Sequence, residues 1–171
     1  MKKVVYQLGD HISTDVIYPG RYMATVLPNE TPQYAFADDP DFNTRLKNKL
    51  IPAGCVIVAG ENFGCGSSRE QAVSTLKGYE FTIVAKSFAR IFLQNAINVG
   101  LNVIICPTIA AKEDDEFEIS PAAIKNLTDR KCFPVTPLPK AAQKILDSGG
   151  LIPYARQRLI HSEKFGKTVS L

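Results

Sequence analysis

Apolar and polar positions alternate along the first two thirds of the chain in a pattern that predicts strands and helices in turn. Residues 4–8 have the weak alternation of a first strand, and Val56-Ile57-Val58 is a β-branched apolar run typical of a buried strand. The elements expected after this run are a helix at 69–77, a strand at 81–85, a helix at 86–98 and a strand at 101–106. Strands that alternate with helices at this spacing predict the α/β fold class, with parallel strand pairs.

The other segments carry weaker signals. Residues 21–48 are interrupted by proline, asparagine and aspartate, which predicts a long functional loop with a short helix at about 41–46. The acidic run at 113–116 is most simply a solvated turn. The elements expected in the last third are strands at 117–119 and 132–135, helices at 138–146 and 151–159, and a polar tail from about 162 to 171. Because no repeat or low-complexity linker interrupts the chain, we expect a single domain over residues 1–171.

The segment from Glu61 to Glu70, with the sequence ENFGCGSSRE, is the most informative part of the chain. Its glycines break the buried strand, and two hydroxyls and a guanidinium follow at the predicted start of a helix. Backbone N–H groups at a helix start lack intrahelical partners and favour negative charge, and arginine adds a rigid donor fork. The segment therefore predicts a receptor for carboxylate or phosphate.

A purely structural interpretation of this glycine segment stays open. Ser67 and Glu70 have the spacing of a capping box, in which each side chain satisfies the backbone N–H of the other. The Gly64-x-Gly66 doublet beside two hydroxyls is more than a cap requires, which favours a functional role. Two nucleotide-binding loops fit less well, because no Gly-Lys-Ser/Thr tripeptide follows these glycines and a dinucleotide fingerprint needs glycine where Arg69 stands.

Composition narrows the function classes. The chain has 171 residues, of which 45% are hydrophobic, and this is enough for one compact core. The net charge of +3 without a long basic block gives no support to nucleic-acid binding. No apolar run is long enough to span a bilayer, and the first residues do not resemble a signal peptide. We therefore expect a soluble cytoplasmic protein with neither a nucleic-acid nor a membrane partner.

The four cysteines are scattered and contain no C-x-x-C pair, so no metal site is expected on this chain. Cys55 and Cys106 lie in strand-like apolar runs and are expected to be reduced thiols that pack as small hydrophobic side chains. Cys65 lies inside the glycine segment and is the thiol expected to meet solvent or ligand. A small residue that fits a tight turn is the simpler interpretation of Cys65.

Three segments resemble, in order and spacing, the motifs of one protein family. They are GDHISTDVIYPGRY at 9–22, NFGCGSSRE at 62–70 and KSFARIFLQNAINVG at 86–100. This family is the small subunit of 3-isopropylmalate dehydratase, the free-standing counterpart of the C-terminal domain of aconitase. The resemblance covers about residues 4–159 and implies an aconitase C-terminal-like swivelling β/β/α domain, a mixed sheet with flanking helices.

The resemblance also implies an activity and a partner. The family dehydrates and rehydrates a small dicarboxylic hydroxy acid as a hydro-lyase, in leucine biosynthesis, and is active only as a heterodimer or heterotetramer with an iron–sulfur large subunit. That partner holds a [4Fe–4S] cluster whose open iron acts as a Lewis acid. The small subunit binds no cofactor of its own and brings the base and the carboxylate contacts.

Roles follow for individual residues by matching position. Ser67 resembles the serine that removes and returns the proton next to a carboxylate, and Ser68 and Arg69 resemble the substrate-carboxylate binders. Asp15, beside Thr14, resembles a residue that orients this shell or the following loop, with a plain turn role equally open. Arg21 is a further candidate substrate-binding residue, with pairing to an acid as the alternative. Arg90 and Asn95 are expected to support structure.

The resemblance places substrate selection just after the Gly-Arg-Tyr segment. Here Met23, Ala24 and Thr25 carry no charge, so a third substrate carboxylate would be buried unpaired, at a cost of several kcal/mol. Citrate and homocitrate are therefore disfavoured, and isopropylmalate is preferred, followed closely by 2-methylmalate and 2,3-dimethylmalate. Two other function classes stay open: a non-catalytic module that binds an anionic metabolite, and, less favoured, a nucleotide binder.

Overall fold

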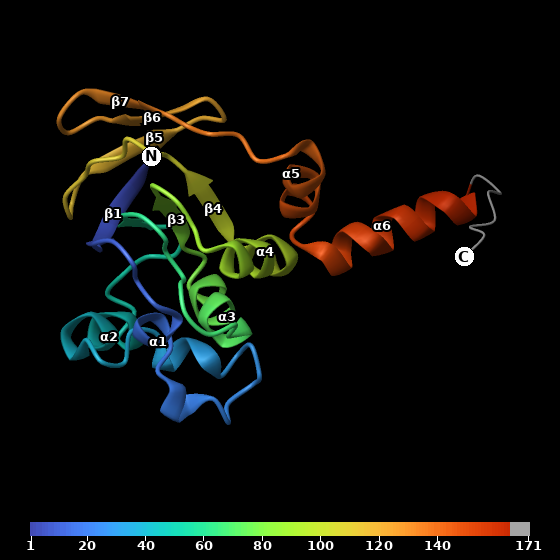
Figure 1. Ribbon diagram of the computed structural model, residues 1–171, viewed down its shortest axis with the longest axis horizontal. Helices are drawn as coiled ribbons and strands as arrows, with labels where there is room; N and C mark the ends of the chain where they lie inside the picture. The colour runs from blue at the N-terminus through green and yellow to red at the C-terminus, as the bar shows by residue number, and fades with distance from the viewer. Residues whose placement is uncertain (165–171) are drawn as a thin grey trace.

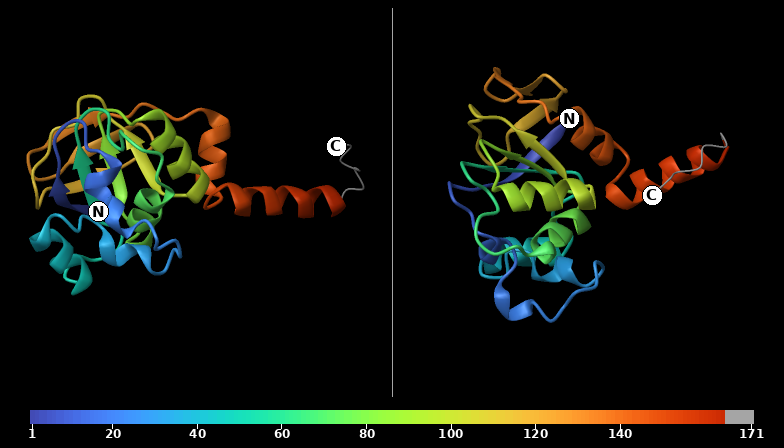
Figure 2. Two further views of the ribbon diagram at one scale, coloured as in Figure 1. Left: turned by 60° about the horizontal axis from the view of Figure 1, so that its bottom comes forward. Right: turned by 45° about the vertical axis from the view of Figure 1, so that its right-hand side comes forward.

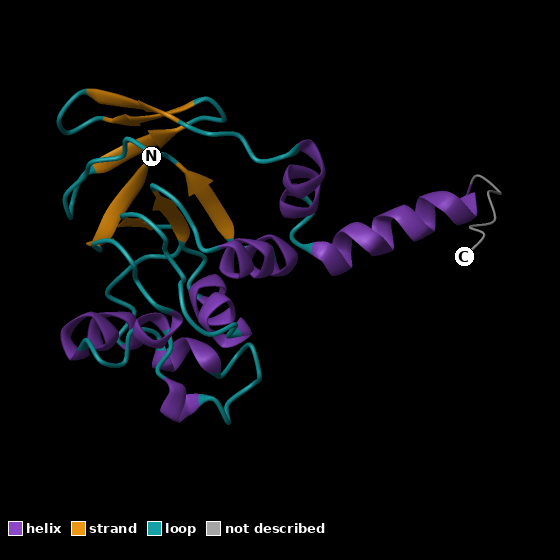
Figure 3. Cartoon of the chain, viewed as in Figure 1, coloured by secondary structure: helices purple, strands orange, loops and turns teal. Residues whose placement is uncertain are grey.

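One mixed sheet of seven strands, in the order β4-β3-β2-β1-β5-β6-β7, organises the computed structural model, which describes residues 1–164 (Figure 3). Strands β1 to β4 are parallel to one another, whereas β5, β6 and β7 continue the sheet from β1 in antiparallel pairs. The strand bounds are β1 Lys2–Gln7, β2 Val56–Ala59, β3 Thr82–Ala85, β4 Asn102–Ile105, β5 Glu116–Ile119, β6 Ala123–Asn126 and β7 Lys131–Pro134. The α/β class and the mixed sheet with flanking helices are confirmed.

The helices lie mainly on one side of the parallel strands, and β5–β7 lie on the other side (Figure 1). The last helix projects away from this body in every view (Figures 1 and 2). The helix bounds are α1 Thr14–Ile17, α2 Pro40–Lys47, α3 Glu70–Gly78, α4 Arg90–Val99, α5 Lys140–Asp147 and α6 Leu151–Lys164, with 3-10 turns at Gly20–Tyr22 and Thr31–Tyr34. None of these helices is long and apolar enough to cross a membrane.

Strands β2 and β3 are buried at every position and therefore on both faces, which explains their nearly continuous apolar sequences. Within β2, Ile57 and Ala59 join the core cluster under the helices. Val56 and Val58 point the other way, into a second cluster that includes Phe117 of β5. The interpretation of the β-branched run as a buried strand is therefore confirmed. Successive side chains of this strand point to opposite faces of the sheet and belong to two separate core clusters.

Helix α4 begins at Arg90, so the prediction of a helix from Lys86 is wrong at this end. The Phe63 N–H donates to the carbonyl of Ser87 at 3.0 Å, and the Asn62 N–H donates to the Ser87 hydroxyl at 2.9 Å. Phe63 and Phe88 also form an isolated parallel bridge. These bonds hold the segment extended against the glycine segment, and the helix starts only beyond them.

The second half of the chain differs from the prediction in three places. Asp115 is 8% exposed and accepts hydrogen bonds from the Lys112 N–H at 2.9 Å and the Asn126 amide at 2.8 Å, so the acidic run is not simply a solvated turn. Strand β6 was missed, because its sequence AIKN shows too short an alternation. The polar tail predicted from about 162 is helical as far as Lys164, and its residues 165–171 lie outside the described residues.

Candidate active site

The three motif segments meet at the carboxyl ends of β1, β2 and β3. Because parallel strands end at one edge of a sheet, the loops that follow them are neighbours, and ligands of open α/β sheets bind at this edge. The Gly64 N–H donates to the Ile12 carbonyl at 2.8 Å, and the Thr14 N–H donates to the Cys65 carbonyl at 2.8 Å. The Ala89 N–H donates to the Phe63 carbonyl at 2.9 Å. The glycine segment is thus bonded to a neighbour on each side.

Two glycines of this segment have positive φ, for different reasons. Gly64 has φ +78°, and a Cβ added there would overlap the Phe92 side chain of α4, so this glycine allows the helix to approach closely. Gly66 has φ +90°, but an added Cβ would meet nothing closer than the Thr14 hydroxyl at 3.7 Å. Gly66 is therefore required for its turn and Gly64 for packing as well.

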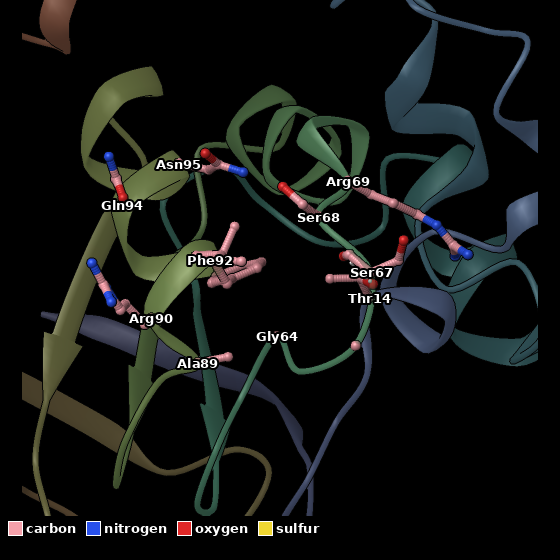
Figure 4. A pocket seen from close by; sticks show the side chains of 12 residues that line it. Thr14, Gly64, Ser67, Ser68, Arg69, Ala89, Arg90, Phe92, Gln94 and Asn95 are labelled. Carbon is pink, nitrogen blue, oxygen red and sulfur yellow. Dashed lines mark hydrogen bonds between the residues drawn. The ribbon is translucent and has the colours of Figure 1, made fainter.

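A pocket of about 490 Å³ opens between the starts of α3 and α4, and we call it the glycine-loop pocket (Figure 4). Ser67 and Ser68 are exposed on its α3 side. Its lining consists of Thr14, Gly64, Gly66, Ser67, Ser68, Arg69, Ala89, Arg90, Ile91, Phe92, Gln94 and Asn95. The loop and helix hydroxyls expected from the sequence therefore face a cavity large enough for a small organic acid.

The capping box predicted for Ser67 and Glu70 does not form. The N-cap of α3 is Arg69, and it makes no side-chain capping bond. The N–H groups of Ser68, Arg69 and Glu70 donate to no backbone carbonyl of the described residues. Both serine hydroxyls are thus free of a capping role, and unpaired donors and the positive end of the helix dipole surround them.

Arg69 is anchored by an acid rather than extended across the pocket. Its guanidinium forms an ion pair with Asp15, whose pKa this hydrogen bond lowers. The Arg69 side chain is 12% exposed, its Nη1 also lies 3.4 Å from the Tyr18 carbonyl, and its buried Nε has no partner. Figure 4 shows the guanidinium turned away from the centre of the pocket. Asp15 therefore fixes the orientation of Arg69 at the pocket wall.

Thr14 supports the serine pair from beneath. Its side chain is 2% exposed, and its hydroxyl donates to the Ser67 carbonyl at 2.9 Å. Ser13 caps α1, since its hydroxyl accepts from the Val16 N–H. The start of α1 thereby ties the first motif segment to the second.

Arg21 and the loop expected to select substrate lie outside the glycine-loop pocket. Arg21 pairs with Asp38 and lies over the Tyr22 ring, 4.8 Å from its centroid. None of the residues Met23, Ala24 and Thr25 lines the pocket. Met23 is 44% exposed. Of the two roles expected for Arg21, the structure therefore shows the ion pair with an acid.

The pocket wall formed by α4 was not expected from the sequence. Arg90, Gln94 and Asn95 line the pocket, whereas Arg90 and Asn95 were interpreted as supporting residues. Asn95 lies one helical turn after the buried Phe92 and so flanks the face that packs on Gly64. In the sequence, the signal for this wall was a polar residue, Asn95, one helical turn after an aromatic residue, Phe92, in the third motif segment.

The described part of the chain, residues 1–164, contains no cluster of metal-ligating side chains. Among the described residues, no group of three or more His, Cys, Asp or Glu side chains could hold a metal ion. Cys55 and Cys106 are buried, and Cys65 is partly exposed, with its thiol 3.3 Å from the His11 carbonyl. An iron–sulfur cluster therefore does not fit the residues described in this chain.

Comparison with known proteins defines the class. The model of the aconitase C-terminal domain family matches residues 12–107, which include all three motif segments almost completely. The chain therefore belongs to the aconitase C-terminal domain family.

Individual relatives narrow this class. The 3-isopropylmalate dehydratase small subunit of Methanosarcina mazei is 44% identical over 162 residues, which cover 92% of this chain and 97% of the relative. The isopropylmalate/citramalate isomerase small subunit of Methanocaldococcus jannaschii is 42% identical over 169 residues, with 95% and 98% covered. The crystal structure of a 3-isopropylmalate dehydratase from the same organism superposes with a TM-score of 0.85, covering 95% and 97%. The resemblance to 3-isopropylmalate dehydratase small subunits is confirmed.

Proposed function

We propose that this chain is the small subunit of a two-subunit hydro-lyase that interconverts 2-isopropylmalate and 3-isopropylmalate in leucine biosynthesis. The observation that carries the proposal is the pair of exposed serines, Ser67 and Ser68, at the start of α3 in the glycine-loop pocket. Two relatives that are more than 40% identical over nearly the whole chain are named 3-isopropylmalate dehydratase small subunit. Its cytoplasmic location stays a prediction.

Ser67 is proposed as the base. A serine hydroxyl is a poor base in water, but its alkoxide is stabilised by nearby N–H donors and the positive end of a helix in a closed, water-poor site. Ser67 has these donors at the start of α3 and no capping bond that would compete for its oxygen. It would remove the proton from the carbon next to a carboxylate and return it to the neighbouring product position during rehydration.

Ser68 and Arg69 are proposed to bind a substrate carboxylate. Ser68 offers a hydroxyl and a free backbone N–H at the helix start. Arg69 lines the pocket wall, but its guanidinium is paired with Asp15 and turned away from the pocket centre (Figure 4). Contact with a substrate carboxylate would therefore require the guanidinium to turn toward the pocket.

The leaving hydroxyl requires a second protein. The family implies an iron–sulfur large subunit, on which a [4Fe–4S] cluster supplies Lewis acid chemistry to the substrate hydroxyl. The chain described here would act as a single swivelling domain that closes its pocket over that partner. Whether the complex is a heterodimer or a heterotetramer is a separate part of this proposal.

The proposed selectivity rests on the uncharged loop at Met23, Ala24 and Thr25. Such a loop suits an alkyl group when the site is closed by the partner, although Arg21 beside it is held by Asp38. An isopropyl group differs from a methyl group by two carbons, each worth about 0.8 kcal/mol when buried. We expect kcat/KM to favour isopropylmalate over 2-methylmalate by roughly tenfold. The name of the Methanocaldococcus jannaschii relative, which includes citramalate, supports 2-methylmalate as the second substrate.

Reconstitution tests the proposal. The purified chain should be inactive alone, and mixing it with an iron–sulfur large subunit from the same organism should produce interconversion of 2- and 3-isopropylmalate. The assay should include 2-methylmalate and 2,3-dimethylmalate. A complex that assembles but converts none of these acids, while the isolated chain binds a dicarboxylate, would instead support the non-catalytic anion-binding module.

A further inference from the structure

Asn95 presents an unused amide to the glycine-loop pocket. It lies on α4 and is partly exposed, and its side-chain amide has no hydrogen-bond partner among the described residues. Figure 4 shows the amide turned toward the Ser68 hydroxyl across the pocket. The amide atoms are not fully buried, so water can satisfy them in the free chain, and a ligand that enters the pocket can replace that water.

The packing of helix α4 fixes the position of Asn95. Phe92, one turn earlier on α4, is 2% exposed and abuts Gly64, and its ring lies 5.2 Å from the Phe63 ring in an edge-to-face arrangement. The Ala89 N–H ties the start of the helix to the Phe63 carbonyl. The α4 wall is thus held at a set separation from the serine pair, which suits a residue that must meet a bound molecule.

We infer that the Asn95 amide and the Ser68 hydroxyl together grip one carboxylate of the substrate from opposite sides of the pocket. This inference rests on the proposed function and extends it, because it gives α4 a substrate-positioning residue. An asparagine amide supplies two N–H donors, and a carboxylate has two oxygens with several acceptor sites. Arg69 is already engaged by Asp15, so an added donor from α4 completes a two-sided contact.

The test uses the reconstituted complex and a near-isosteric change. Asn95→Asp keeps the size of the side chain but replaces donors with a negative charge, so KM for isopropylmalate should rise at least tenfold. Asn98→Asp is the matched control: it adds the same charge to the same helix at a position that does not line the pocket, and KM should stay within twofold. Asn95→Ala, which adds no charge, should raise KM several-fold with a smaller change in kcat.

A double-mutant cycle identifies the shared carboxylate. If Asn95 and Ser68 grip the same group, the effects of Asn95→Ala and Ser68→Ala on KM should be clearly non-additive. Thermal melting and gel filtration with the large subunit check that each variant folds and assembles. If Asn95→Asp does not fold or assemble, Asn95→Ala provides the test. Wild-type turnover with unchanged KM in both Asn95 variants, or strict additivity, would overturn this inference alone. A wild-type complex without turnover would overturn the proposed function and this inference together.

Discussion

Substituting Gly64 with alanine should damage the chain more than the same change at Gly66. Both residues have positive φ, which costs an L-residue about 1–2 kcal/mol. At Gly64 the new Cβ would also lie 2.5 Å from the Cβ of Phe92 and closer still to its ring, so overpacking adds about 1–3 kcal/mol. We expect unfolding free energies lower by about 2–5 kcal/mol for Gly64→Ala and about 1–2 kcal/mol for Gly66→Ala.

Urea denaturation of the two variants measures this difference, and Phe92→Ala provides the mechanistic control. This substitution removes the Cγ and ring atoms that lie closest to the new methyl, so Phe92→Ala should cost less in the Gly64→Ala background than in the wild type. The expected coupling is about 1 kcal/mol or more, since the two residues are in direct contact. In the Gly66→Ala background no coupling is expected. Equal losses for the two glycine variants, or no coupling at Gly64, would show that the Phe92 contact does not explain the requirement for glycine.

Two further predictions concern acid stability and thiol reactivity. Hydrogen bonds from the Phe42 N–H and the Tyr6 hydroxyl lower the pKa of Asp39, the N-cap of α2. Its contribution is therefore present above the unfolded pKa of about 3.9 and lost as the pH falls through the lower folded pKa. Asp39→Ala should lose about 1 kcal/mol at pH 7 and much less at pH 2 in urea denaturation; an equal loss at both would contradict the charge-based cap. With a thiol reagent, exposed Cys132 should react rapidly and Cys106 slowly, because burial raises the pKa of the Cys106 thiol; comparable rates in the folded chain would refute this.

The parallel part of the fold was accessible from the sequence because burial on both faces leaves a direct signature. The run Val56-Ile57-Val58 has no polar position, and such a β-branched run is typical of a strand covered on both sides. The antiparallel strands were harder to predict from the sequence. Strand β6, for example, has the short sequence AIKN and depends on pairing with β5 and β7. Tertiary pairing also decided the start of α4, where hydrogen bonds to Ser87 replace the first helical turn that local preference predicts.

The candidate site could be predicted from the sequence only in part, where a local pattern marks its residues. Ser67 and Ser68 stand out because two hydroxyls after a glycine doublet exceed what a turn requires, and both face the pocket. The capping box was a misleading local pattern, because α3 begins at Glu70 and its N-cap is Arg69 rather than Ser67. The ion pair between Arg69 and Asp15 joins residues distant in sequence, so no local pattern reveals it. The same holds for the α4 wall.

The turnover number of the Ser67→Ala complex is the most direct test of the account. The substitution removes the proposed base and leaves the helix start and Ser68 in place, so kcat for isopropylmalate should fall by about 10²–10⁴ with the complex still assembled. Ser120→Ala, at an exposed serine of the β5–β6 turn outside the glycine-loop pocket, should leave kcat unchanged. A Ser67→Ala complex whose kcat stays within a few-fold of the wild type would contradict the assignment of proton transfer to this chain.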